Sequence, residues 1–258
     1  MTRKRLKDIA TLARRKGRLA HGQFLVEGVR SVEAAVDAAA PLIEVLVAHG
    51  AVDDGRVAAL ADRAAVPVHR VAARDLDRVG DARTSQGVVA VARSVVEGGL
   101  DDRAGGAVLA LDGVQDPGNV GALVRTAAWF GVEVVVADEK TADFETPKAV
   151  RASMGGVWDV RLVRVPALGP ALDALRAGGH ALWGADLGGV PVSAWRPPPR
   201  SALVLGSEAH GLSADVAGRL GADVVHIPGA AERGGGRGGV ESLNVGVAAG
   251  VLLARWLG

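Results

Sequence analysis

The sequence predicts an α/β protein built from two domains. Short apolar segments of strand length alternate with helical stretches along most of the chain. A glycine- and charge-rich stretch, residues 94–106, interrupts this alternation and has the composition of a linker. In the part of the chain after this stretch, glycines and polar residues follow the predicted strand ends, where open α/β sheets bind their ligands.

The first domain, residues 21–93, is expected to hold a mostly parallel or mixed sheet. Its predicted strands are 24–26, 42–48, 66–71 and 87–92, and its predicted helices are 31–40, 57–65 and 75–79. The second domain, residues 107–258, follows the same alternation at a larger size. Its predicted strands, with helices between them, are 107–111, 132–137, 158–165, 180–185, 201–205 and 223–227. A last helix is expected to open with Glu241, Ser242, Leu243 and Asn244.

The N-terminal segment, residues 1–20, is strongly basic. It carries eight lysines and arginines against one acid, so the rest of a chain of net charge +1 is acidic. Phosphate contacts by such side chains supply most non-specific affinity for nucleic acid. We therefore expect this segment to contact RNA or DNA, with the contacts at Arg14, Arg15, Lys16 and Arg18. The alternative is a solvated, partly disordered tail.

Several classes of protein are disfavoured by what the sequence lacks. No apolar run reaches the roughly 18 residues of a membrane helix, and no signal peptide is recognisable. The chain has no cysteine, and its six histidines show no i, i+4 pair, so we expect no disulfide and no metal site. The loop at residues 111–121 lacks GxGxxG and the chain has no GxxxxGK[ST], so neither a nucleotide-dependent dehydrogenase nor a P-loop protein is supported. We expect a cytoplasmic protein that does not contact the membrane.

The first of three polar loops, residues 111–121, leads from a strand into a helix. Helical spacing places side-chain-poor positions and one cation on a single helix face: Gly118, Gly121, Ala122 and Arg125. Such a face could support a substrate backbone beneath a guanidinium group. Equally, it could serve close helix–sheet packing, with Arg125 paired to Asp112 or Asp116.

The second and third loops follow the last two strands of the second domain. In residues 203–213, Gly206 ends a strand and would let a ligand approach the backbone, with Glu208 just beyond it. The alternative is a turn before a helix capped at Ser213. Residues 224–250 pass through a glycine- and arginine-rich loop to Asn244, a poor helix former in an apolar run. Taken alone, this third stretch could be a capped helix behind a flexible loop.

Together the three loops resemble the SpoU family of RNA ribose 2′-O-methyltransferases. The first contains NxGxxxR at residues 119–125, the second reads LGSEAHGLS, and the third reads IP followed by ESLNVGVAAG, in the family's order. This resemblance covers residues 107–258. Residues 15–92, with GQFLVEG at 22–28 and TSQG at 84–87, resemble the RNA-binding domain that many members carry.

The resemblance implies a fold and a chemistry. It implies a SPOUT fold with a deep trefoil knot, a homodimer, and S-adenosylmethionine bound largely by backbone groups at Gly206, Ile227 and Leu243. The residues that match the family's polar active-site set are Asn119, Arg125, Glu208, Ser242 and Asn244. The substrate is expected to be RNA, with ribosomal RNA preferred because the first domain is similar to a module for structured RNA. A guanidinium stays protonated in proteins, so we expect Arg125 to orient the hydroxyl rather than to act as a simple base.

The sequence departs from the family pattern near the third loop. Gly229 stands where a methionine is usual, Gly246 stands where a serine is common, and residues 232–239 look like an insertion. Two alternatives stay open at this point: a methyltransferase acting on transfer RNA, and an RNA-binding protein that keeps the fold without the reaction.

Overall fold

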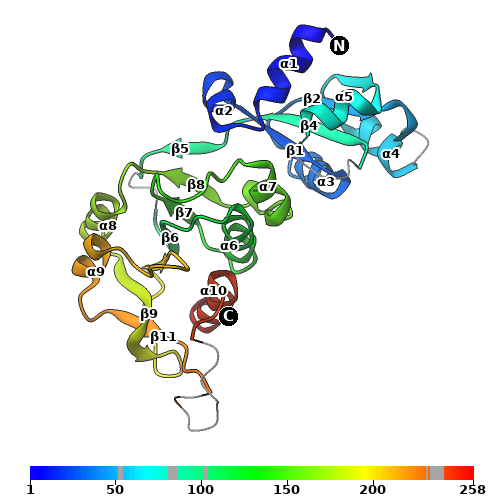
Figure 1. The fold of residues 1–258 in the computed structure, drawn as a ribbon. Coiled ribbons are helices and arrows are strands. Elements are labelled where there is room, and N and C mark those ends of the chain that lie inside the picture. The colour runs from blue at the N-terminus through cyan, green and yellow to red at the C-terminus, as the bar shows by residue number, and fades with distance from the viewer. Residues whose placement is uncertain (52–54, 81–85, 101–103, 231, 233–240) are drawn as a thin grey trace. The chain divides into compact units, whose positions relative to one another are not determined.

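The computed structural model describes residues 1–51, 55–80, 86–100, 104–230, 232 and 241–258. These residues form two compact units (Figure 1). The first combines residues 1–95 with residues 143–159, and the second combines residues 96–142 with residues 160–258. Among the described residues, no helix is both long and apolar enough to cross a membrane.

The first unit has a four-stranded mixed sheet in the order β1-β4-β2-β3. Strand β4 runs antiparallel to both β1 and β2, whereas β2 and β3 are parallel. Its elements are α1 (Arg3–Thr11), α2 (Arg15–His21), β1 (Gln23–Glu27), α3 (Val29–Asp37), β2 (Leu42–Ala48), the 3-10 turn η1 (His49–Ala51), α4 (Gly55–Arg63), β3 (Val68–Val71), α5 (Ala73–Val79), β4 (Val88–Arg93), α7 (Pro147–Ser153) and the 3-10 turn η2 (Gly156–Trp158).

Alternating strand residues give this sheet two apolar faces, and each is covered by helices. One core includes Phe24, Val32 and Leu60 with Val150, and Trp158 stacks on Phe24 at 5.6 Å. The other core lies under α1 and α5. The α/β class predicted for this unit is confirmed.

The N-terminal segment is part of this fold. Ile9 and Leu12 of α1 are 0% and 1% exposed and lie in the second core. The alternative of a disordered tail is therefore wrong. It arose because eight cations hide an apolar i, i+3 pair in the composition of this segment.

The second unit has a seven-stranded sheet in the order β11-β9-β10-β6-β7-β8-β5, in which every pair is parallel. Its elements are β5 (Val96–Gly98), β6 (Val108–Asp112), α6 (Pro117–Trp129), β7 (Val134–Ala137), β8 (Arg161–Arg164), α8 (Leu168–Ala177), β9 (Ala181–Pro191), β10 (Ser201–Gly206), α9 (Ala214–Leu220), β11 (Val224–His226) and α10 (Val245–Leu257). Helices α8 and α9 pack on one another, and α6 packs on α10 (Figure 1).

Three boundaries differ from the sequence-based expectation. The stretch 94–106, expected as a linker, contains β5, which pairs with β8. The strand expected at 158–165 begins only at Arg161, because Trp158 lies in the core of the first unit. The last helix begins at Val245 rather than at Glu241. In the first two cases the deciding partner lies more than sixty residues away, so no local pattern could reveal it.

The two motif segments of the first domain can be followed only in part. The Gln86 side chain accepts a hydrogen bond from the Val29 amide at 3.0 Å, which joins the loop after β1 to the start of β4. Thr84 and Ser85 lie outside the described residues. Residues 233–239, which make up most of the predicted insertion, also lie outside them.

Candidate functional site

The candidate site is built at the ends of β6, β10 and β11 in the second unit. Helix α6 starts here because Asp116 is its N-cap, accepting hydrogen bonds from the Gly118 and Asn119 amides at 2.7 and 3.0 Å. Pro117 occupies the first helical turn, where its missing N–H costs nothing. The Asp-Pro pair is a helix-start signal in the sequence, and it fixes where Asn119 emerges.

A buried network supports the loop that precedes α6. The Asp138 carboxylate accepts hydrogen bonds from the Gly113 amide at 3.1 Å and from the Thr141 hydroxyl at 2.7 Å. The Thr141 hydroxyl oxygen also accepts from the Val114 amide at 3.2 Å. Sequence reasoning missed both side chains, because the loop they hold is about 25 residues upstream and no motif links them.

The second loop is joined to the first by Asp112. Its carboxylate accepts a hydrogen bond from the Ser213 amide at 2.6 Å, across the neighbouring strands β6 and β10. Gly206 is required at the end of β10, because a Cβ there would lie 2.3 Å from the backbone of Gly211. That close approach makes a tight turn in which Ser207 and Gly211 exchange backbone hydrogen bonds. Glu208 lies exposed within this turn.

Three predicted residues, one from each loop, form a continuous hydrogen-bonded chain. The side-chain amide of Asn119 donates to the Glu208 carboxylate, and the side-chain amide of Asn244 donates to the side-chain oxygen of Asn119 at 3.1 Å. The side-chain oxygen of Asn244 in turn accepts hydrogen bonds from the backbone amides of Gly246 and Val247. Asn244 is therefore the N-cap of α10, which explains a poor helix former at this position. We call Glu208, Asn119 and Asn244 the amide chain.

The other two predicted catalytic residues stand apart from the amide chain. Arg125 is exposed on α6, and its side chain makes no hydrogen bond or ion pair with any residue that the structure describes. Neither acid proposed as its partner takes that role, because Asp112 binds the Ser213 amide and Asp116 caps α6. Ser242 is likewise exposed and without a side-chain partner among the described residues.

The residues expected at the cofactor differ in exposure. Ile227 is half-buried directly after β11, and Leu243 is 47% exposed beside the amide chain. Their main-chain groups make no backbone hydrogen bond with other described residues, so they are available to a ligand. Gly246, where the family commonly has serine, lies against Ala122: a Cβ there would meet the Ala122 Cβ at 3.6 Å. A side chain at this position would meet Ala122 at an ordinary contact distance, and its nearest neighbour would be the Asn244 side-chain oxygen at 3.2 Å.

Of the four cations predicted to contact RNA, Arg18 has a structural role instead. Its side chain is 4% exposed and pairs with Asp143 through contacts of 2.6 and 3.1 Å. It also donates to the backbone carbonyls of Leu12 and Ala13. Arg14, Arg15 and Lys16 remain exposed. Charge density in the sequence could not separate the buried cation from its neighbours.

Comparisons with known proteins identify the family of both parts of the chain. The SpoU rRNA Methylase family matches residues 106–254, and the MRM3-like substrate binding domain matches residues 3–90. The chain is 30% identical over 250 residues to the 23S rRNA (guanosine(2553)-2′-O)-methyltransferase RlmP of Bacillus subtilis, covering 96% of this chain and 94% of that protein. It is 35% identical over 248 residues to the 23S rRNA (guanosine-2′-O-)-methyltransferase RlmB of Xanthomonas axonopodis pv. citri, covering 90% and 94%.

A solved structure shows the same architecture over nearly the whole chain. The SpoU methyltransferase AviRb of Streptomyces viridochromogenes, in complex with the cofactor AdoMet, superposes with a TM-score of 0.84 at 27% identity, covering 98% of this chain and 97% of that one. The matched domains and the identities over nearly the whole chain show that it belongs to the SpoU rRNA methylase family.

Proposed function

We propose that this protein transfers a methyl group from S-adenosylmethionine to a ribose 2′-hydroxyl of ribosomal RNA. The observation that carries the proposal is the amide chain, which brings Glu208, Asn119 and Asn244 together from three loops. The names of RlmP and RlmB, both 23S rRNA 2′-O-methyltransferases, support the substrate class. We assign methyl transfer to the second unit and RNA recognition to the first.

The cofactor fits the main-chain groups that the fold leaves available. Ile227 and Leu243 offer backbone groups without backbone partners among the described residues. Gly206, the third expected contact, begins the tight turn that follows β10. S-adenosylmethionine would supply a methyl group on a positively charged sulfur, which is already an activated electrophile. The protein must therefore mainly align the reactants and help the hydroxyl lose its proton.

The side chains would divide this work between them. The amide chain fixes the three loops, so that the ribose meets prearranged donors and acceptors. The Arg125 guanidinium, free and exposed, would orient the 2′-hydroxyl or an adjacent phosphate and stabilise the developing oxyanion. As the new carbon–oxygen bond forms and the carbon–sulfur bond breaks, the hydroxyl proton would pass to water. Ser242, exposed next to Leu243, would contact the RNA.

Exposed apolar residues on α6 and α10 support a homodimer. Trp129 is 84% exposed, and Val247 and Val251, one helical turn apart on α10, are 55% and 39% exposed. Large apolar side chains exposed on two helices that pack together are expected at an interaction site. The variant Val251→Glu should lower the sedimentation coefficient to that of a monomer, whereas Ala217→Glu, on an exposed position of α9, should not. A wild-type monomer would contradict the proposal.

Two further features of the proposal follow from the family. The chain passes from β10 to β11, which lies beyond β9 at the sheet edge, and returns to α10 against α6. This order of elements supports a trefoil knot in the second unit. A ribosomal RNA substrate in turn favours a cytoplasmic location, which fractionation of cells expressing the protein would test.

The direct test is methyl transfer from labelled S-adenosylmethionine to ribosomal RNA by the wild type and by Arg125→Ala. We expect a loss on the order of a hundredfold or more, as for removal of one group that stabilises a developing oxyanion. The melting temperature should stay constant, because the Arg125 side chain has no partner among the described residues. Arg200→Ala removes another exposed arginine of the same unit and serves as the control.

Undiminished activity of Arg125→Ala would overturn the role of this residue. Calorimetry separates the main rival function: an RNA-binding protein without the reaction would bind RNA but not S-adenosylmethionine. Transfer RNA included as a parallel substrate distinguishes the second alternative, because it would then be methylated in preference to ribosomal RNA.

A further inference from the structure

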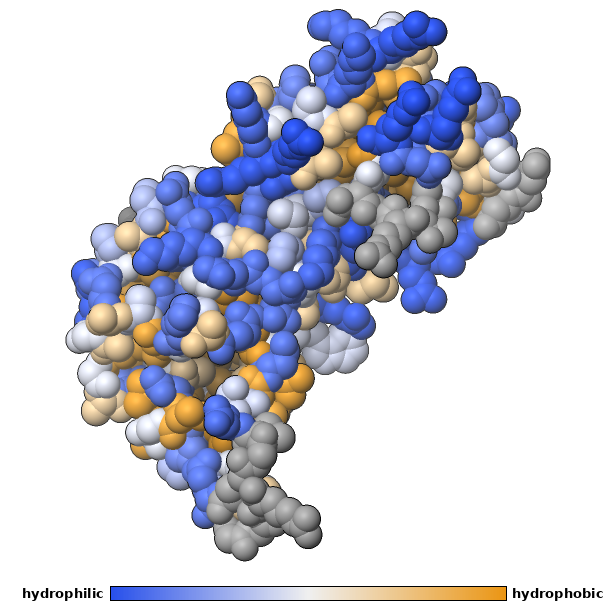
Figure 2. Space-filling view, in the orientation of Figure 1, coloured by the Kyte–Doolittle hydropathy of each residue, from blue (hydrophilic) through white to orange (hydrophobic). Residues whose placement is uncertain are grey.

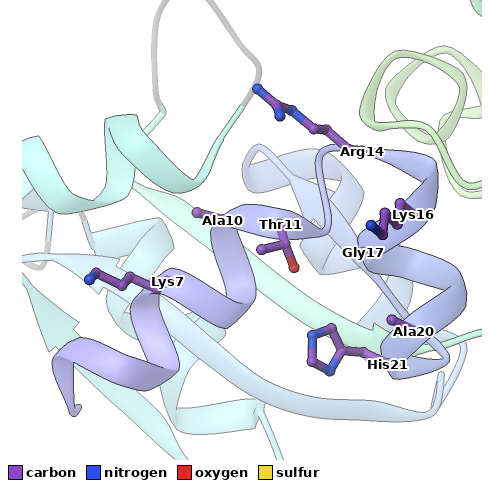
Figure 3. Close-up of a pocket in the computed structure, with 8 residues that line it drawn as sticks. All are labelled: Lys7, Ala10, Thr11, Arg14, Lys16, Gly17, Ala20 and His21. Atoms are coloured by element: carbon purple, nitrogen blue, oxygen red, sulfur yellow. The ribbon is translucent and has the colours of Figure 1, made fainter.

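A groove lies between α1 and α2 in the first unit (Figure 3). Its volume is about 460 Å³, within the range of roughly 300–1,000 Å³ that is usual for ligand sites. Its floor is made by small residues, namely Ala10, Thr11, Gly17 and Ala20. The side chains of Thr11 and His21 face the space between the two helices.

Basic side chains without a partner among the described residues line the groove. Its lining includes four basic side chains, Lys7, Arg14, Lys16 and His21, all exposed. None of the four makes a side-chain hydrogen bond or ion pair with a described residue. By contrast, two other cations of the same segment are paired, Arg5 with Glu44 and Arg18 with Asp143. In Figure 2, strongly hydrophilic residues over α1 and α2 border a paler, more apolar strip.

The groove is held in shape from both sides. Helix α1 is anchored by Ile9 and Leu12 in the core, and α2 is anchored by the buried Arg18. Gly17 is essential to the approach of the two helices, because a Cβ there would lie 2.1 Å from the Thr11 carbonyl oxygen. A ligand would therefore meet a preformed surface and lose little affinity to ordering it.

We propose that this groove holds one unpaired nucleotide of the substrate RNA together with its flanking phosphates. The inference rests on the proposed function, since it names where that RNA is gripped. Phosphates would lie on Lys7, Arg14 and Lys16, while the base would rest on the small-residue floor near His21. Cations on both helices, rather than at one end, fit a strand that crosses the groove better than a single free phosphate.

The test measures binding of a fluorescein-labelled ribosomal RNA hairpin by full-length variants at several salt concentrations. Point variants are used because deleting α1 would remove Ile9 and Leu12 from the core. Lys7→Ala should weaken binding several-fold and lower the salt slope by about 0.7–0.9, the value for one lost phosphate contact. Lys4→Ala is the matched control: it removes an equal charge from an exposed position of α1 outside the groove.

A second variant, Ala20→Leu, fills the groove without changing its charge. Weakened RNA binding by Ala20→Leu at an unchanged melting temperature supports a seated nucleotide, because a diffuse basic surface would not sense the added side chain. Equal effects of Lys7→Ala and Lys4→Ala, together with unaltered binding by Ala20→Leu, would overturn the proposal. Adenosine monophosphate is tested as a competitor, and saturable binding of it without any loss of RNA affinity in Lys7→Ala would also overturn it.

The binding assay keeps this inference separate from the proposed function. If the wild type methylates ribosomal RNA while the groove variants bind it normally, the groove proposal fails and the proposed function stands. If no RNA is methylated while the groove variants lose binding, the proposed function fails and the groove remains an RNA site.

Discussion

Asn244 joins helix capping to the candidate active site, and its replacement by alanine should damage both. The side-chain oxygen of Asn244 accepts hydrogen bonds from the backbone amides of Gly246 and Val247. Its side-chain amide donates to the side-chain oxygen of Asn119 at 3.1 Å. Loss of an asparagine N-cap costs about 1 kcal/mol. Loss of the hydrogen bond adds about 0.5 kcal/mol, the low end of the usual range, because Asn244 is exposed and water can replace it.

A destabilisation of about 1.5 kcal/mol should lower the melting temperature by roughly 3–6 °C, since domains of about 150 residues shift by about 2–4 °C per kcal/mol. Thermal unfolding followed by circular dichroism measures this directly. Methyl transfer should fall as well, because Asn119 loses one of the two contacts that fix its amide.

Asn244→Asp separates the two effects. Aspartate caps a helix as well as asparagine does, and its attraction to the positive end of the helix dipole, about 0.3–1 kcal/mol, offsets the lost hydrogen bond, so the melting temperature should hold. It cannot donate to the Asn119 carbonyl oxygen, so methyl transfer should fall at unchanged stability. Full activity in Asn244→Asp would refute the role of the amide chain, and an unchanged melting temperature in Asn244→Ala would refute the capping argument.

Three further predictions concern the packing around the site and the first unit. Gly206→Ala should unfold at a lower temperature and lose S-adenosylmethionine binding, because its Cβ would lie 2.3 Å from the Gly211 backbone; wild-type calorimetry would contradict this. Arg18→Ala should destabilise the fold by about 3 kcal/mol in denaturant titrations, the low end for a broken buried pair, because Asp143 keeps 18% exposure. Burial raises the pKa of Glu145 above 4.5, so this carboxyl stabilises the fold fully below pH 4.5 and loses that contribution as pH rises through its folded pKa. Glu145→Gln should therefore show a smaller decline in melting temperature from pH 4.5 to neutral, and a decline equal to that of the wild type would count against this assignment.

Much of the second unit could be predicted from its sequence. The strands of the sheet are short apolar runs, and the polar residues that follow them mark the loops of the site. Asn119, Glu208 and Asn244 could be named because the three motifs that contain them resemble those of the SpoU family. Their mutual hydrogen bonds could not be predicted, because they depend on how residues more than thirty positions apart in the sequence meet in space.

The sequence by itself determined the α/β class, the alternation of elements and the residues of the three loops, because periodicity and turn chemistry act over a few neighbouring positions. Only the tertiary structure decided that Arg18 is buried on Asp143, that Trp158 packs on Phe24 in the first unit, and that Arg125 has no side-chain partner among the residues described. Each of these outcomes depends on burial and on a distant partner. A cation in a basic segment and a tryptophan after a helix have the same local pattern whether they end in a core, in an ion pair or in solvent.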